Sequence, residues 1–471
     1  MVPNPINYEI FPSVFPADTE TEVIIAPTER AFLFFDDKEY SLKIIPVNSD
    51  ETSYKSPTLH DKFTVKAKDG VIRFNYTFKG EQEHTVILSR DEEKLAVFTV
   101  YSLLPDLYDL RPLKGDLHSH SYRSDGKRDP AALAGHYREQ GYEFFALTDH
   151  NRYYPGKEID ETYAGVKLGF LHVQGEETHT PGSIVHIVHV GGKASVDEKY
   201  VNEPEAYETS VAECLSRVPE SVPEKYRDRY ARAMWATEEI HKVGGLAIFP
   251  HPYWKPGSSL AYNVCDEFAE ILLTSGMFDA YELVGAMKQV GVNRSVALYN
   301  DLRAKGLSIA VVGSSDVHKI TNSVEFPYHY TVCFAKENST ESIIDAVKAQ
   351  NCVAVEENGA GYNIDYRCYG SLRLVSYAQF LLREFYPKLI RICAGEGVAM
   401  RSYAMGDASA ALIEAQVEQS EKFRLRFFGK LKPALPSPEI IEFENRWREV
   451  HLKSPITKGS GITSDKVSRQ I

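Results

Sequence analysis

Two pairs of side chains in this sequence have the spacing of a metal site. Residues 116–120 read Asp-Leu-His-Ser-His, and Asp316 and His318 form a second pair. Residues i and i+2 of a β-strand leave the same face, so His118 and His120 can bind one metal ion. Asp316 and His318 can converge on an ion in the same way.

Further histidines and acids follow short apolar stretches that favour strands. Asp125 lies in SYRSDG, Asp149 and His150 end FFALTDHN, Glu176 and Glu177 lie in VQGEETHT, His186 and His189 lie in GSIVHIVHV, and His251 lies in GGLAIFPHP. In α/β barrels the C-terminal ends of the strands carry the catalytic residues. We therefore expect these side chains to meet at one end of a barrel.

The chemistry of this set is that of a polynuclear metal site. It offers five or six histidines and three or four carboxylates, with no thiolate among them. One tetrahedral ion cannot use so many ligands, which indicates two or three divalent ions, such as zinc, manganese or iron, that share a bridging carboxylate. Such ions polarise a phosphoryl or carbonyl oxygen and make hydroxide available near neutral pH. The predicted reaction class is metal-assisted hydrolysis.

The elements that would position these residues follow a β-rich region, residues 1–112. In FTVKAKDGVIRFNYTF, apolar and polar residues alternate on both sides of Asp69-Gly70, which predicts a hairpin with a type I′ turn. The predicted facing pairs are Ala67 with Ile72, Val65 with Phe74, and Phe63 with Tyr76. Similar runs recur at the spacing of a small β-sandwich, and no cluster of catalytic residue types occurs among them. We interpret this region as an accessory domain.

Residues 113–356 change to short apolar strands that alternate with helices, as in an α/β barrel. The predicted strands include residues 144–147, 246–249, 280–284 and 309–312. The predicted helices include residues 131–140, 230–243, 294–305 and 342–349. Gly141, Gly244 and Gly306 stand where three of these helices must end.

Residues 357–471 form a predicted helical extension, with helices over residues 372–393, 408–428 and 438–452. The last stretch, KSPITKGSGITSDKVSRQI, is polar and rich in Gly and Ser, and we expect it to be partly disordered. At about 150 residues per domain, the length of 471 residues predicts roughly three domains. The three regions, 1–112, 113–356 and 357–471, are those divisions.

The composition is that of a soluble globular protein, with 53 Lys and Arg against 66 Asp and Glu and a net charge of −13. An acidic surface repels a polyphosphate backbone, so we expect a small-molecule ester substrate and no stable binding of duplex nucleic acid. The N-terminal MVPNPINYEIF lacks a signal-peptide pattern, and no window reaches ~18 apolar residues. These features predict a cytoplasmic protein without a membrane partner, and they leave the oligomeric state open.

The strings DLHSHS, SDG, ALTDHN, GEET, HI, PHP and GSSDVH, in this order, resemble the PHP superfamily, which is named after polymerase and histidinol phosphatase. The resemblance covers about residues 113–356. It implies a distorted (β/α)7 barrel with a di- or trinuclear metal centre at the C-terminal ends of the strands. A β-sandwich before the barrel and helices after it resemble the branch that includes carbamate and ester hydrolases.

The resemblance also implies a set of metal ligands. They are His118, His120, Asp316 and the bridging Glu177 for the first ion, His186 and His251 for the second, and Asp125, His150 and His318 for the third. Glu177 is preferred over Glu176 because it is the third residue of a G-x-E string. His189 stays an alternative to His186, which we prefer because Gly191 follows it at the family's spacing.

For other residues near the motifs, the sequence leaves the role open. Asp149 is either an extra ligand or a carboxylate that orients one, since metal-binding histidines need such a partner. Arg152 and Lys319 can reach a phosphate, and we take them with Asp149 as candidate catalytic residues. Further cations near the motifs are Arg123 and Lys127, and the aromatic neighbours that can form a wall for a ring-bearing substrate are Tyr153, Tyr154, Tyr253 and Trp254. His179 can line the site, although we prefer to interpret it as an ordinary core or surface histidine.

The sequence thus predicts a PHP-type metal-dependent phosphoesterase that hydrolyses a small phosphate ester or a nucleotide with metal-activated hydroxide. The alternative enzyme is a carboxylic ester or carbamate hydrolase that uses the same site. A non-catalytic PHP module with a structural or regulatory role is disfavoured, because every motif position holds an acceptable ligand. The acidic balance also disfavours a processive exonuclease.

Overall fold

The computed structural model describes residues 7–36, 38–48, 52–53, 56–57, 60–257, 259–285, 287–358 and 365–451. The chain divides into two compact units, Met1–Tyr108 with Lys422–Ile471, and Asp109–Glu421. The region after residue 357 is thus shared between the two units, and the two boundaries between the three predicted domains stay a prediction. The polar tail predicted from residue 453 onward lies outside the described residues.

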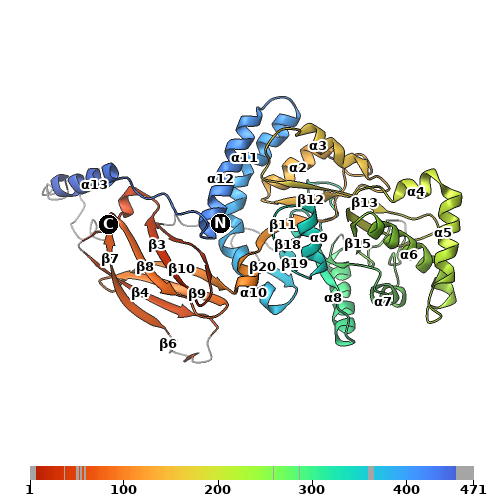
Figure 1. Ribbon diagram of the computed structural model, residues 1–471, viewed down its shortest axis with the longest axis horizontal. Helices are drawn as coiled ribbons and strands as arrows, with labels where there is room; N and C mark the ends of the chain where they lie inside the picture. Colours follow the sequence, from red (N-terminus) through yellow and green to blue (C-terminus); the bar gives the residue numbers. More distant parts are fainter. Residues whose placement is uncertain are drawn as a thin grey trace. The chain divides into compact units, whose positions relative to one another are not determined.

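The first unit is built on an eight-stranded sheet with the order β1-β3-β8-β7-β4-β9-β10-β2 (Figure 1). The strands are β1 (Tyr8–Phe11), β2 (Val14–Pro16), β3 (Glu20–Pro27), β4 (Glu39–Pro46), β7 (Asp61–Lys68), β8 (Val71–Thr77), β9 (Gln82–Arg90) and β10 (Glu93–Leu103). Val23 and Ile25 of β3 share one buried core with Leu42 of β4 and Val86 of β9. The two halves of the sheet therefore face each other across a common core. A short pair, β5 (Thr52–Ser53) and β6 (Ser56–Pro57), stands apart from it.

The predicted hairpin at Asp69-Gly70 is confirmed at its turn and opens beyond it. Ala67 pairs with Ile72 as predicted, and Asp69 and Gly70 both have positive φ. Further out, β7 pairs with β4 and β8 pairs with β3, so each strand joins a different half of the sheet. The outer predicted pairs persist only as side-chain contacts, such as the rings of Phe63 and Tyr76 at 6.1 Å.

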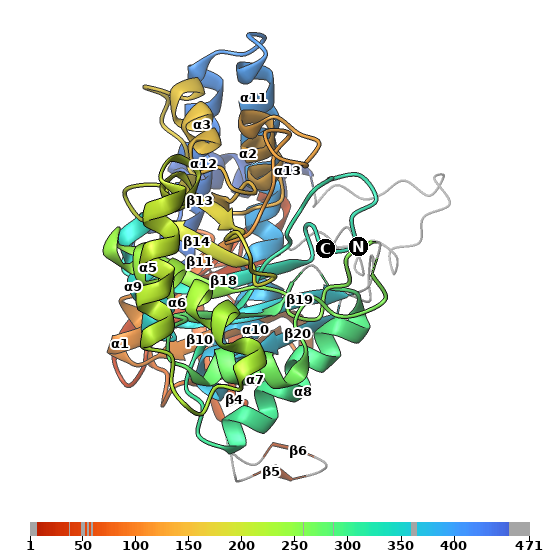
Figure 2. The same ribbon diagram turned by 90° about the vertical axis from the view of Figure 1, so that its right-hand side faces the viewer.

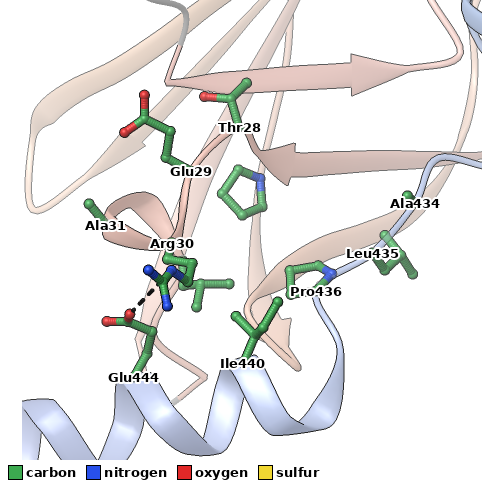
Figure 3. A pocket seen from close by; sticks show the side chains of 11 residues that line it. Thr28, Glu29, Arg30, Ala31, Ala434, Leu435, Pro436, Ile440 and Glu444 are labelled. Carbon is green, nitrogen blue, oxygen red and sulfur yellow. Dashed lines mark ion pairs between the residues drawn. The ribbon is translucent and has the colours of Figure 1, made fainter. Parts of the chain in front are cut away.

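Helix α13 (Pro438–His451) belongs to the same unit and lies beside the segment that follows β3 (Figure 3). A hollow of about 710 Å³ lies between them. Its lining mixes apolar residues, such as Leu33, Leu435 and Ile440, with polar ones, and Arg30 reaches Glu444 at 4.0 Å across it. The remaining pieces of this unit are a 3-10 turn (Arg30–Phe32) and the one-turn helix α1 (Pro105–Tyr108).

The second unit contains a ten-stranded, nearly closed, barrel-like sheet with the order β17-β16-β15-β14-β13-β12-β11-β18-β19-β20 (Figure 2). The strands are β11 (Arg111–Asp116), β12 (Phe144–Leu147), β13 (Leu171–Thr178), β14 (Ile187–Gly191), β15 (Gly245–Phe249), β16 (Ala280–Val284), β17 (Ala310–Gly313), β18 (His329–Ala335), β19 (Cys352–Asn358) and β20 (Asp365–Tyr369). The strands predicted over 144–147 and 280–284 are found at those residues. Gly313 of the edge strand β17 and Thr331 of β18 exchange hydrogen bonds, which draws β17 toward the strands at the other end of the sheet.

Alternation along the strands creates two cores. Leu246 and Ile248 of β15 face an inner cluster, whereas Ala247 and Phe249 face an outer cluster shared with helices. The helices of this region are α2 (Pro130–Glu139), α3 (Lys157–Thr162), α4 (Asp197–Asn202), α5 (Pro204–Ser216), α6 (Arg227–Lys242), α7 (Asp266–Thr274), α8 (Gln289–Ala304) and α9 (Thr340–Lys348), with 3-10 turns at Tyr154–Gly156 and Glu224–Tyr226. Ile343 of α9 joins the inner cluster, so this helix helps to close the interior.

The predicted distorted (β/α)7 barrel is not confirmed. β11, β12 and β13 are parallel, and β15, β16 and β17 continue in the same direction, but β14 is antiparallel to both of its neighbours. β18 is likewise antiparallel to β11. Six parallel strands nevertheless end at one edge of the sheet.

The helical extension begins with α10 (Leu372–Glu384), α11 (Tyr386–Ala404) and α12 (Ala410–Phe427), and α11 packs along α2 (Figure 1). The single helix predicted over residues 372–393 is wrong. The chain breaks at Phe385, because Pro387 starts a new helix. A buried ion pair, Arg138 Nε to Glu396 Oε2 at 2.7 Å, joins α2 to α11. None of the described helices has the length and apolar character needed to cross a membrane.

Lys114 of β11 is buried away from the sheet interior. Its Nζ lies 4.1 Å from the ring centroid of Tyr330 and 4.4 Å from that of Tyr142, and it donates a hydrogen bond to Gln140 O at 3.3 Å. Burial lowers the pKa of Lys114 to about 8, although Glu357 opposes this shift. Lys114 is therefore still protonated at pH 7, but the folded protein binds this proton less tightly than the unfolded chain does.

We expect Lys114→Met to raise the free energy of unfolding at pH 7. Between the folded pKa of about 8 and the ordinary value of 10.5, the unfolded chain binds more protons, so wild-type stability should rise with pH over that interval. At about 1.4 kcal/mol per pKa unit, the free energy of unfolding of the wild type should rise by roughly 2–3 kcal/mol relative to that of the variant as the pH rises. Chemical denaturation at pH 7 and pH 9.5 measures this, with the exposed Lys336→Met as control. A difference between wild type and variant that does not change with pH would contradict the prediction.

Candidate metal centre

The predicted ligands converge where the six parallel strands end. Seven of them follow or close a strand: His118 and His120 after β11, His150 after β12, Glu177 near the end of β13, His251 after β15, and Asp316 and His318 after β17. Asp125 lies in the loop after β11, and His186 directly precedes β14. Backbone bridges join these ends directly, between Ser119 and Val317 and between His150 and Glu177. The structure thus brings together segments that are up to 200 residues apart in the sequence.

Four side chains, three of them buried, form the first group: His118, His120, Glu177 and Asp316. His118 Nε2 lies 3.2 Å from His120 Nε2, 3.4 Å from Glu177 Oε2 and 3.3 Å from Asp316 Oδ1. His120 Nε2 lies 3.5 Å from Glu177 Oε2 and 2.6 Å from Asp316 Oδ1. A tetrahedral ion with bonds of about 2.0–2.2 Å keeps its ligand atoms roughly 3.3 Å apart, so most of these distances fit one shared ion.

The other oxygen of Glu177 faces a second group. Glu177 Oε1 lies 2.9 Å from His186 Nδ1 and 3.2 Å from His251 Nε2. These three residues offer ligand atoms close enough to hold one ion. The two oxygens of Glu177 therefore point to two different ligand groups, which is the arrangement of a bridging carboxylate.

A third group lies closer to solvent and consists of Asp125, His150, His318 and His120. Asp125 Oδ1 is 3.1 Å from His318 Nε2 and 3.5 Å from His150 Nε2. The ring of His120 stacks between those of His150 and His318, each at 4.3 Å. The Asp125 side chain is 57% exposed whereas His118 and His120 are fully buried, so this group is the outermost of the three.

Several buried nitrogen and oxygen atoms that could bind a metal have no hydrogen bond among the described residues. They are His150 Nδ1, Glu177 Oε2 and Asp316 Oδ1, and the Nε2 atom of the neighbouring His179 is unpaired as well. Buried polar atoms are otherwise nearly always paired, so their concentration here calls for a partner. Imidazole nitrogens and carboxylate oxygens without thiolates suit zinc, manganese or iron. The donor set therefore fits divalent ions.

The electrostatics prepare most of these donors for cations. Burial alone would raise the pKa of Glu177, but His118 and His186 hold it well below its usual range. Burial lowers the pKa of His186 to about 4, so its ring is neutral at pH 7. Burial opposes protonation of His118 as well, yet Asp316, Glu177 and Glu282 raise its pKa overall. A metal ion would displace that proton.

Glu282 of β16 is a residue of the site that the sequence analysis missed. Its Oε2 lies 2.9 Å from His118 Nδ1, and both side chains are fully buried. A carboxylate on the far nitrogen of a metal-binding histidine fixes the ring orientation and its tautomer. The available signal was a single acid inside the apolar stretch AYELV.

Asp149 is buried and belongs to none of the three groups. It accepts hydrogen bonds from Ser121 N at 2.8 Å, Ser121 Oγ at 2.6 Å and Ser124 Oγ at 2.5 Å. These bonds hold the loop that carries Asp125. The same loop folds so tightly that a Cβ on Gly126 would lie 2.4 Å from His120 O. Asp149 thus supports a loop, in contrast to the ligand role that the sequence left open.

The two alternatives within the GEE and HI strings lie on opposite faces. Glu177 and His186 face the metal groups, whereas Glu176 Oε1 pairs with His189 Nδ1 at 3.0 Å behind them. Ser195 Oγ and the backbone N–H of residue 196 also donate to Glu176. The placement agrees with the preference for Glu177 and His186, and their roles as ligands stay predictions.

The predicted substrate contacts are only partly brought to the site. Lys319 lines a pocket of about 350 Å³ beside Asp316 and His318, together with Trp254 and Asn322. The Arg152 side chain is exposed, and no ion pair or hydrogen bond joins its guanidinium to the ligand groups in the described part of the chain. Lys127 is exposed as well, and Arg123 pairs with Glu158 at 2.6 Å.

Of the four aromatic neighbours, Trp254 is the one that contacts the ligand groups. Its ring lies 5.8 Å from that of His186 and 6.1 Å from that of His251. Tyr153 is buried and donates to Gly192 O, Tyr253 is buried, and Tyr154 donates to Glu198. These three tyrosines have local packing and hydrogen-bonding roles.

Two candidate ligands have an unusual backbone. His251 has a φ of 23° and Asp316 has a φ of 48°, both in the left-handed region that side chains other than glycine disfavour. Strain of this kind persists where the surrounding structure enforces it, and it is concentrated at functional sites. Here it turns both side chains from the ends of their strands toward Glu177.

Comparisons with known proteins give similarity to solved structures only. No family model matches the chain, and no curated protein does. A two-domain protein from Bacteroides vulgatus, described as containing a predicted PHP-like metal-dependent phosphoesterase, is 18% identical over 57% of this chain and 78% of its own, with a TM-score of 0.35. An amidohydrolase from Chromobacterium violaceum, with bound sulfate and no metal, is 18% identical over 45% of this chain and 89% of its own, with a TM-score of 0.31.

His120→Ala should lower the metal content of the protein and abolish turnover, because His120 contributes to both the first and the third group. The sheet of the first unit should stay folded, since none of its core residues is touched. Elemental analysis of the purified variant, with circular dichroism as a check on folding, measures this. His136→Ala, which removes a histidine of α2 that pairs with Glu139, is the control. Wild-type metal content in His120→Ala would refute the site.

Asp149→Asn should weaken the outermost ion selectively. An amide oxygen cannot replace both carboxylate oxygens as acceptors, so the loop with Asp125 should loosen. We expect a 10- to 100-fold loss of affinity for one ion, roughly the effect of losing a supporting partner, and unchanged affinity for the others. Metal titration of the apoprotein measures this, with the exposed Asp160→Asn as control. A loss of every ion, or of none, would contradict it.

Proposed function

We propose that the chain is a PHP-type metal-dependent phosphoesterase that acts on a small phosphate ester or a nucleotide. The observation that carries the proposal is the division of Glu177 between two ligand groups, with a third group beside them. Donors in this number and of these types suit two or three ions, such as zinc, manganese or iron. The resemblance of the sequence motifs to the PHP superfamily supports the same conclusion.

Bound ions at such a centre would polarise the phosphoryl group and lower the pKa of the attacking water. The protein's own contribution is to fix the donors before the substrate arrives. Glu282 orients His118, and Asp149 holds the loop of Asp125. The strained, left-handed backbone of Asp316 turns its carboxylate inward. A site that is already organised avoids the free-energy cost of rearrangement during the reaction.

The surroundings of the centre favour a small anionic substrate. Lys319 lines the pocket beside the third group and can contact a phosphate oxygen, and Trp254 provides an apolar surface on the same side. The pocket of about 350 Å³ is within the usual size of a site for a small molecule. Arg152 stays a candidate that would need to swing toward the substrate.

The test compares two substrates on protein loaded with manganese or zinc. We expect faster hydrolysis of p-nitrophenyl phosphate than of a p-nitrophenyl carboxylic ester. Thorough chelation should abolish the activity, and divalent metal should restore it. Lys319→Ala should raise KM for the phosphate more than it lowers kcat, with the exposed Lys127→Ala as control.

Each contrary result has a distinct meaning. Faster turnover of the carboxylic ester would replace the phosphoesterase assignment with the carbamate or ester hydrolase. Activity that survives chelation would contradict the metal-dependent mechanism. Less than one ion per chain together with no hydrolysis of either ester would favour a non-catalytic module.

A further inference from the structure

His179 lies at the centre although no motif includes it. It follows β13 two residues after Glu177, which is the same spacing as His118 with His120 and Asp316 with His318. Since i and i+2 leave the same face of a strand, Glu177 and His179 both point to the ligand groups. His172, near the start of the same strand, points the other way and pairs with Asp160 at 3.1 Å.

The imidazole of His179 is aimed at Glu177. Its Nε2 lies 3.5 Å from Glu177 Oε1, and that nitrogen is buried without a hydrogen bond in the described structure. His150, Glu177 and His179 offer ligand atoms within 4.8 Å of one another. The ring also stacks on that of His186 at 3.7 Å and lies 4.6 Å from that of His150.

The backbone around His179 is fixed in place. Its N–H donates to Asn151 Oδ1 at 3.1 Å, and the N–H of Asn151 donates to Glu177 O at 3.0 Å. Tyr200 Oη also donates to Asn151 Oδ1 at 2.7 Å, and Asn151 itself has a φ of 53°. A strained residue held by three hydrogen bonds thus sets the position of His179 relative to Glu177.

We propose that His179 is an additional metal ligand, whose Nε2 binds an ion held by Glu177. The inference rests on the metal centre of the proposed function and adds a residue that the family motifs do not contain. Its Nε2 is separated from Glu177 Oε1 by about the distance between two ligands of one tetrahedral ion, roughly 3.3 Å. His172 and His189 also have a buried, unpaired ring nitrogen, but that of His179 is directed at the carboxylate that the ligand groups share.

The experiment compares His179→Asn with His172→Asn, the same change on the opposite face of the same strand. Apoprotein of each variant and of wild type is titrated with Co²⁺, and the ions bound per chain, their affinities and the visible d–d absorption are recorded. We expect His179→Asn to bind at least one ion tenfold or more weakly and to show a changed d–d spectrum. His172→Asn should match wild type in all three measurements.

The outcomes separate the inference from the proposed function. Wild-type stoichiometry, affinity and spectrum in His179→Asn would overturn the inference, even if the wild type hydrolyses phosphate esters. Weakened metal binding in that variant would support it, even if the wild type hydrolyses neither ester. Binding of no Co²⁺ by the wild type would overturn the inference together with the metal centre.

Discussion

A single buried carboxylate organises this structure. Glu177 is fully buried, and six imidazoles lie within 3.5 Å of it, from His118, His120, His150, His179, His186 and His251. An unpaired buried carboxylate would cost several kcal/mol, so the fold must supply positive charge at this point. Six imidazoles cannot all be protonated side by side, because like charges at this distance repel strongly. Divalent ions bound by these side chains would satisfy both demands.

The topology of the sheet explains how so many donors reach one carboxylate. Parallel strands deliver residues at their C-terminal ends, which accounts for His118, His150, His251 and Asp316. β14 runs in the opposite direction, so its beginning lies at that same edge and His186 precedes it. A strictly parallel strand at this position would place its beginning at the other edge. The antiparallel direction of β14 is therefore part of how the centre is assembled.

Much of this arrangement could be predicted because strand periodicity and ligand type are local properties of the sequence. Period-2 and helical patterns located β12, β16 and α2 to within a residue or two, and the motifs located most of the residues that meet at Glu177, with His179 as the exception. The direction of β14 could not be predicted, since hydrogen-bond pairing depends on distant partners. The break at Phe385 carried a local signal, Pro387, which the apolar pattern of the long stretch outweighed.

The supporting residues are harder to find because their function exists only in three dimensions. Glu282 and His118 are 164 positions apart and meet across the sheet, and Asp149 acts on Ser121 and Ser124 of another loop. Neither carboxylate differs in type from a ligand, so only geometry separates the two roles.

The side chains of the centre differ in exposure from one side to the other. The group around His118 and His120 is sealed, and the group with Asp125 meets solvent. The pocket with Lys319 adjoins Asp316 and His318 on the exposed side of the centre. The buried residues therefore secure the charge of Glu177, and the exposed residues remain available to an incoming ligand.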